Sequence, residues 1–172
     1  MAAQAFAIAA SQSAFAQAPC LPKASLPAVS GTVINVSTEA QLQSAIQNAQ
    51  SNTTVLLAAG TYNLSSTLYI RRGNITLRGD GDTCDKVALV GKGMDNDNYG
   101  EVPYGIWSDA TGLTLTNLTI RDVYYHGVIL NSGAQSPVFN SIQILNTGQQ
   151  HMKANPTSYG VGVNNGIDRK SV

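Results

Sequence analysis

The chain has 172 residues, of which 43% are hydrophobic, and this is enough for one domain with a substantial core. Only 12% of the residues are charged, against roughly 25% in an average soluble protein, so hydroxyl and amide groups supply much of the polar surface. Ten basic residues balance ten acidic ones. This neutrality excludes an overall field that would attract nucleic acid or an anionic membrane.

The first 18 residues are rich in alanine, carry no charge and end in small-x-small cleavage patterns. This pattern predicts a signal peptide over residues 1–18, and therefore a secreted, periplasmic or cell-surface protein. The segment lacks the usual basic start, which leaves a disordered alanine-rich tail as the alternative. No run of about 18 apolar residues occurs, so we expect no membrane span. Residues 19–32 contain three prolines and are interpreted as a lead-in or linker.

Cys20 and Cys84 are the only two cysteines of the sequence. In an exported chain such a pair most simply forms one disulfide, which is our prediction. Metal binding by two isolated cysteines fits less well. A lipid anchor on Cys20 also fits less well, because the residues before it are a poor context for acyl transfer.

A strand is predicted at residues 33–36 and a short amphipathic helix at 38–50, where the apolar residues share one helical face. Thr38 and Gln41 fit a capping box at the start of this helix. Beyond the helix the hydrophobic period changes to two, which predicts many short strands and no second helix. These strands are expected at 55–57, 68–70, 75–77, 87–90, 113–115, 118–120, 128–130, 142–144 and 161–163.

Two motifs recur among the expected strands. The first is a pair of aliphatic residues flanking one position, in Ile75-x-Leu77, Leu118-x-Ile120 and Ile142-x-Ile144. The second places a glycine at the start of a strand, in Tyr104-Gly105-Ile106, His126-Gly127-Val128 and Tyr159-Gly160-Val161. Spacings in the low twenties are typical of a solenoid whose units stack on one another. Asn74 and Asn117 each precede such a strand, and asparagine tolerates the left-handed backbone of a turn.

The sequences INVSTEAQLQSAIQNAQSNTTVLLAAGTYNL, NITLRGDG and GLTLTNLTIRDV together resemble the start of a right-handed parallel β-helix repeat protein of the pectate-lyase-like superfamily. The resemblance covers residues 33–167. It implies an all-β, right-handed parallel β-helix (solenoid) with an N-terminal amphipathic capping helix. Residues 168–172 neither continue the repeat nor cap it, so we expect an N-terminal fragment that is truncated at its C-terminal end.

The resemblance implies a secreted carbohydrate-active protein, with an extended uronate-bearing polysaccharide as its partner. Its leading implication is a polysaccharide lyase that works by β-elimination, for which the family often uses Ca²⁺ and a lysine or arginine base. A hydrolase is less expected, because the paired aspartate motifs of that branch are absent from the sequence. A non-catalytic glycan-binding or adhesive module, or an inactive fragment of a larger enzyme, remains the alternative.

Titratable and hydroxyl side chains are most concentrated just before the strand at 128–130. There we predict Arg121 and His126 as catalytic residues and Tyr124 and Tyr125 as substrate-binding residues, because a histidine acts as a base at neutral pH. A histidine packed in a turn is the simpler alternative for His126.

Two further candidates come from other parts of the chain. Lys153, in the longest insertion of the repeat, is a third catalytic candidate, although an ordinary solvated lysine fits as well. Arg78 is a candidate for binding a uronate carboxylate, or else a solvated surface residue.

Asp95 and Asp97 open a run that is similar to the start of a calcium-binding loop. Alternating oxygen ligands before a glycine bend suit a hard cation such as Ca²⁺, so we predict these two residues as metal ligands. The later positions of the run do not supply the usual ligands, and a turn rich in aspartate and asparagine is the alternative.

Overall fold

The computed structural model describes residues 20–94, 101–148 and 161–164, and these residues are mostly β-structure. The strands are β1 (Thr32–Val36), β2 (Thr53–Leu57), β3 (Gly60–Asn63), β4 (Leu68–Ile70), β5 (Ile75–Gly79), β6 (Val87–Val90), β7 (Tyr104–Ser108), β8 (Thr114–Val123), β9 (His126–Asn131), β10 (Val138–Thr147) and β11 (Val161–Asn164). One α-helix, α1 (Glu39–Asn48), and two 3₁₀ turns, Lys23–Ser25 and Cys84–Lys86, complete this part of the chain.

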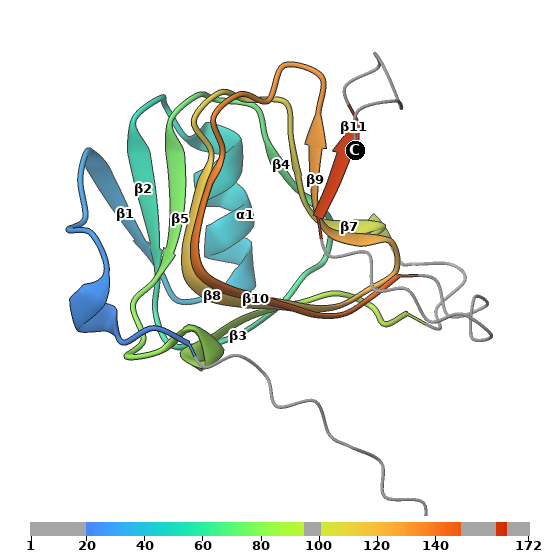
Figure 1. Ribbon diagram of the computed structural model, residues 1–172, viewed down its shortest axis with the longest axis horizontal. Coiled ribbons are helices and arrows are strands. Elements are labelled where there is room, and N and C mark those ends of the chain that lie inside the picture. Colours follow the sequence, from blue (N-terminus) through green and yellow to red (C-terminus); the bar gives the residue numbers. More distant parts are fainter. Residues whose placement is uncertain (1–19, 95–100, 149–160, 165–172) are drawn as a thin grey trace, which may run out of the picture.

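All strand pairs described are parallel and they belong to two sheets. The seven-stranded sheet has the order β1-β2-β5-β8-β6-β3, and β10 also pairs with β8. The four-stranded sheet has the order β11-β9-β7-β4. Figure 1 shows β1, β2, β5, β8 and β10 side by side on one side of α1, with β4 and β9 on its other side. The helix contacts β1, β2 and β4.

The predicted fold class, a right-handed parallel β-helix (solenoid) truncated at its C-terminal end, is wrong. The described strands form two open sheets, and neither sheet closes on itself. The recurring spacing that suggested a solenoid is a property of parallel pairing. Neighbouring parallel strands need a crossover of a dozen or more residues between them, so a regular spacing arises without closure.

The two repeated motifs differ in how well they predicted the strand register. Tyr104 lies opposite His126 and Leu118 opposite Ile142, as the motifs predicted. The expected equivalence of Leu77 and Ile120 is wrong, because Leu77 lies opposite Leu115. The reason is that β8 is one long strand with a bend at Asn117, where φ is 56°, and so it contains two apolar segments that were expected as separate strands.

A column of left-handed residues runs along one end of the seven-stranded sheet. Its members precede neighbouring strands at equivalent positions and all have positive φ: Gly31, Asn52, Asn74, Gly112 and Ser136. Within the column the Asn74 side-chain amide donates to the Asn52 side-chain oxygen at 3.0 Å. Both Asn74 and Asn117 have the predicted left-handed backbone, Asn74 in this column and Asn117 at the bend inside β8.

Helix α1 confirms the expected helix and its cap. The Thr38 hydroxyl accepts from the Gln41 backbone N–H at 3.2 Å, and the Gln41 side chain accepts from the Ser37 N–H at 2.8 Å. The Glu39 carboxylate accepts from both the N–H and the hydroxyl of Ser65, each within 3 Å. Burial raises the pKa of Glu39, but these hydrogen bonds outweigh it, so the pKa lies below its ordinary value.

The apolar residues of both sheets and of α1 form one core. Alternate residues of the strands point into it, as the two-residue period predicts, and Leu77, Leu115, Ile106 and Val128 are fully buried there. No helix among the described residues is long and apolar enough to cross a membrane.

The N-terminal segment (residues 20–31) lies over the outer face of the seven-stranded sheet, on the side away from α1 (Figure 1). The Leu21 N–H donates to the Ser141 hydroxyl of β10 at 2.9 Å, and the Thr54 hydroxyl of β2 donates to the Ser30 carbonyl at 2.7 Å. The predicted disulfide between Cys20 and Cys84 is present, with the two Cα atoms 5.3 Å apart. The expected lead-in is thus attached to the sheet at several points.

Candidate functional site

The predicted site lies at the corner where the chain passes from β8 of the larger sheet to β9 of the smaller one. Asp122 has a φ of 57° and bends the end of β8, so that Tyr124 and Tyr125 form the connection to His126 at the start of β9. The Tyr125 N–H donates to the Pro103 carbonyl at 3.0 Å, which attaches this connection to the residue before β7. The corner is therefore fixed by backbone bonds.

Four rings gather at this corner, and we call Tyr104, Tyr124, Tyr125 and His126 the corner cluster. The centroid of the Tyr104 ring lies 5.8 Å from that of Tyr125 and 6.1 Å from that of His126. The rings of Tyr124 and Tyr125 meet edge to face at 4.8 Å. Tyr124 is buried, whereas the other three are half-buried, so the cluster presents ring edges and faces to solvent.

The half-burial of His126 affects its protonation. Burial lowers the pKa of His126 below its ordinary value of 6.5, because the charged imidazolium loses hydration. The ring is therefore neutral at pH 7 and has one nitrogen able to accept a proton.

Arg121 is engaged by its own neighbour. Its guanidinium forms an ion pair with the Asp122 carboxylate, whose other oxygen accepts from the Asn146 side-chain amide at 3.1 Å. An arginine has five N–H donors, so one carboxylate leaves others for a ligand. The pair is partly exposed, and the attraction of Arg121 for a second carboxylate is reduced by Asp122.

Arg78 lies apart from the corner cluster, beneath the N-terminal segment. It is 7% exposed, and its guanidinium donates to the Pro27 carbonyl. A ligand reaches Arg78 only if this segment moves. The structure thus places Arg78 where it holds the segment to β5.

Three of the predicted site residues, Lys153, Asp95 and Asp97, lie outside the described residues, and their roles stay predictions. Within the described ranges, no group of three or more histidine, cysteine, aspartate or glutamate residues converges on one point. The acidic side chains near the disulfide are otherwise engaged: Asp80 pairs with Lys23, and Asp85 accepts from the Thr83 hydroxyl. The Ca²⁺ site predicted at Asp95 and Asp97 therefore stays a prediction.

A second aromatic group, which the sequence analysis did not find, lies on the outer face of the four-stranded sheet. Tyr69 of β4 and Trp107 of β7 lie opposite each other, with ring centroids 5.7 Å apart. The Arg71 guanidinium carbon lies 5.1 Å from the Trp107 ring and 5.9 Å from the Tyr69 ring. We call Tyr69, Arg71 and Trp107 the arginine–aromatic cluster. The signal for it was an aromatic residue at the outward position of the strand Leu68-Tyr69-Ile70.

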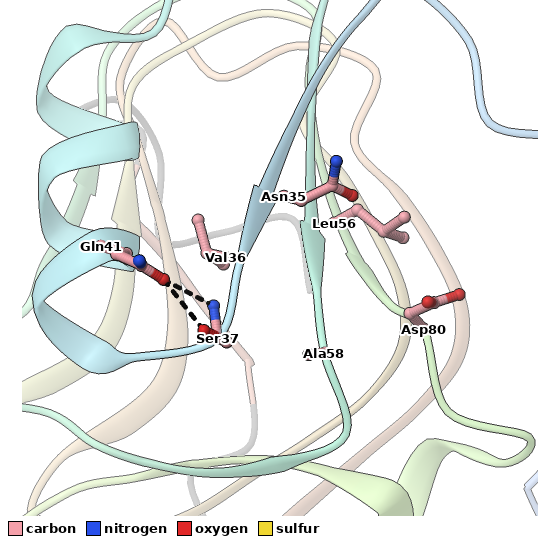
Figure 2. Close-up of a pocket in the computed structure, with 7 residues that line it drawn as sticks. All are labelled: Asn35, Val36, Ser37, Gln41, Leu56, Ala58 and Asp80. Atoms are coloured by element: carbon pink, nitrogen blue, oxygen red, sulfur yellow. Dashed lines mark hydrogen bonds between the residues drawn. The ribbon is translucent and has the colours of Figure 1, made fainter.

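A shallow pocket of about 190 Å³ lies near the start of α1, away from both clusters. Figure 2 shows Val36 and Gln41 on the helix side of β1, and Asn35, Leu56 and Asp80 on the other side of the strands. The polar atoms of Gln41 and Ser37 bond each other as part of the helix cap (Figure 2). The pocket is thus a consequence of capping, and it contains none of the predicted site residues.

Comparison of the chain with protein-family models, with curated proteins and with solved structures found no match. The resemblance to the pectate-lyase-like superfamily therefore stays a prediction. The functional argument below rests on the side chains of the two clusters.

Proposed function

We propose that this protein is exported and binds an extended, uronate-bearing polysaccharide. The observation that carries the proposal is the corner cluster, where the centroids of the half-buried Tyr125 and His126 rings lie 5.8 Å and 6.1 Å from that of the half-buried Tyr104 ring. Aromatic rings stack on the apolar faces of sugar rings, and their polar atoms bond the hydroxyls. Arg121, a few residues before these rings, supplies N–H donors for a carboxylate.

Export is supported by the disulfide between Cys20 and Cys84, because such bonds persist in oxidising compartments. The balance of charges over the whole chain also favours recognition through a local site, since no overall field attracts polyanions. A ligand of this protein is therefore selected by local ring and guanidinium geometry.

Binding should be measured with polygalacturonate, alginate and hyaluronan, and with carboxyl-reduced polygalacturonan as the neutral counterpart. We expect at least one acidic polymer to bind more tightly than the neutral one, and binding to weaken with salt. The change Tyr125→Ala should raise Kd about fivefold, through the loss of about 1 kcal/mol of stacking. The matched control is Val138→Ala, which truncates a side chain 52% exposed on the other sheet. Equal effects of the two changes would contradict the proposed site.

Cleavage by β-elimination is the second candidate, because the lowered pKa of His126 keeps its imidazole in the neutral form that is able to accept a proton. In this reaction the imidazole takes the proton α to the uronate carboxylate, a carbon–carbon double bond forms, and the glycosidic carbon–oxygen bond breaks. The leaving oxygen then takes up a proton. The unsaturated product absorbs in the ultraviolet, so its appearance with the wild type and its loss with His126→Ala would establish cleavage. Binding without any absorbing product would leave the protein a binding module.

A further inference from the structure

The arginine–aromatic cluster holds an exposed cation against two aromatic side chains. Tyr69 is 46% exposed, and Arg71 is exposed beside it. No carboxylate of the described residues forms an ion pair with Arg71, in contrast to Lys23 and Arg121. The charge of Arg71 is therefore available to a ligand, while the rings of Tyr69 and Trp107 limit where the guanidinium lies.

The strand pattern shows that these rings are not needed for the core. Leu68, Ile70 and Ile106, their neighbours along β4 and β7, are buried in the core, so Tyr69 and Trp107 take the outward positions. Tryptophan, tyrosine and arginine are the residue types most enriched at binding hot spots, and all three meet here. The guanidinium of the cluster matches a carboxylate bidentately.

We propose that Tyr69, Arg71 and Trp107 form a second sugar-binding subsite, specific for an acidic sugar unit. The Arg71 N–H groups bind the carboxylate, and the exposed Tyr69 ring stacks against the sugar ring. The choice of an acidic glycan as the ligand rests on the proposed function, whereas the position of the subsite rests on the arginine–aromatic geometry alone. Because the two rings already restrict Arg71, this side chain loses less conformational freedom when a ligand binds than an isolated surface arginine would lose.

The subsite has a built-in reporter. Trp107 is the single tryptophan of the sequence, so the tryptophan emission of the intact protein reports on this cluster. A carboxylate that binds Arg71 changes the charge next to the indole ring, and a stacked sugar changes its exposure. Both changes alter the emission.

The test is a fluorescence titration of the full chain with trigalacturonate, and in parallel with its carboxyl-reduced trisaccharide. We expect a saturable change of Trp107 emission with the acidic sugar alone. The change Arg71→Gln should weaken the affinity for the acidic sugar at least about tenfold. The change Arg71→Lys keeps the charge but loses the planar guanidinium, and it should weaken the affinity by an intermediate factor. The matched control is Arg72→Gln, which removes the same charge from the next exposed residue and should shift the midpoint less than about twofold.

The outcomes separate this subsite from the proposed function. If Arg71→Gln and Arg72→Gln weaken the titration equally, the effect is one of general charge and the subsite is wrong. If acidic polymer binds the wild type with no change of emission, the proposed function stands and the subsite is wrong. If Tyr125→Ala leaves binding intact while Arg71→Gln abolishes it, the corner cluster is not the site and the subsite stands. A thermal unfolding curve for each variant shows that it is folded.

Discussion

The outer faces of the two sheets differ in what covers them. On the seven-stranded sheet, the N-terminal segment crosses the strands and buries Arg78 to 7% exposure. On the outer face of the four-stranded sheet, Tyr69 is 46% exposed, and the Arg71 guanidinium lies next to its ring. Both arginines follow the same local pattern of apolar and polar residues. The comparison teaches that a distant segment decides which arginine can meet a ligand.

The largest expected effect concerns the disulfide that holds the covering segment in place. Its two cysteines are 64 residues apart, and closing a loop of that length stabilises the folded state by about 4 kcal/mol in the chain-entropy model. We therefore expect urea unfolding to show that the double variant Cys20→Ala, Cys84→Ala has a free energy of unfolding about 4 kcal/mol below that of the wild type. Wild-type protein treated with a reductant should lose a similar amount. An unchanged unfolding midpoint in both would show that the segment is held by its other contacts.

The two arginines provide a direct contrast of intermediate size. Arg78→Ala removes a buried side chain and leaves the Pro27 carbonyl without its donor, so we expect a loss of about 2 kcal/mol in the free energy of unfolding. Arg71→Ala changes an exposed side chain, and a loss below about 0.5 kcal/mol is expected. Urea unfolding of the two variants measures this difference. Equal losses would mean that the covering segment contributes nothing through Arg78.

Features that follow from a short motif or from a residue count could be predicted from the sequence. The cap of α1 follows from Thr38 and Gln41, and the positions of most strands follow from the two-residue period. The pairing of Tyr104 with His126 followed from a motif in which both precede a glycine. The disulfide followed from the cysteine count and the expected compartment. In each case a single motif, period or residue count was sufficient for the prediction.

Contacts between distant residues that no motif or residue count marks could not be predicted. The burial of Arg78 is caused by Pro27 and its neighbours, which no periodicity connects with β5. The approach of Tyr69 to Trp107 requires the register of β4 against β7, and two strands of the other sheet, β5 and β6, lie between them in the sequence. The solenoid was inferred from spacing, but spacing does not determine whether sheets close. Long-range contacts thus bring together the residues of the arginine–aromatic cluster and bury Arg78 away from the corner cluster.

His126 of the corner cluster is half-buried, and so it lies between the buried Arg78 and the exposed Arg71. The pH dependence of its contribution to stability is the smallest effect that we expect. Burial lowers the pKa of His126 in the folded protein below the ordinary value of 6.5 that applies to the unfolded chain. Below pH 6.5 the unfolded chain therefore binds more protons than the folded one. The stability that neutral His126 provides is complete above this pH and is lost as the pH falls toward the folded-state pKa.

The measurement is the difference in free energy of unfolding between the wild type and His126→Gln, taken at about pH 8 and at about pH 5. Other titrating groups are common to both proteins and cancel in this difference. We expect the wild type to lose more stability than the variant on acidification. The opposite sign would mean that a neighbouring group stabilises the imidazolium, and this would count against His126 as the neutral base of β-elimination.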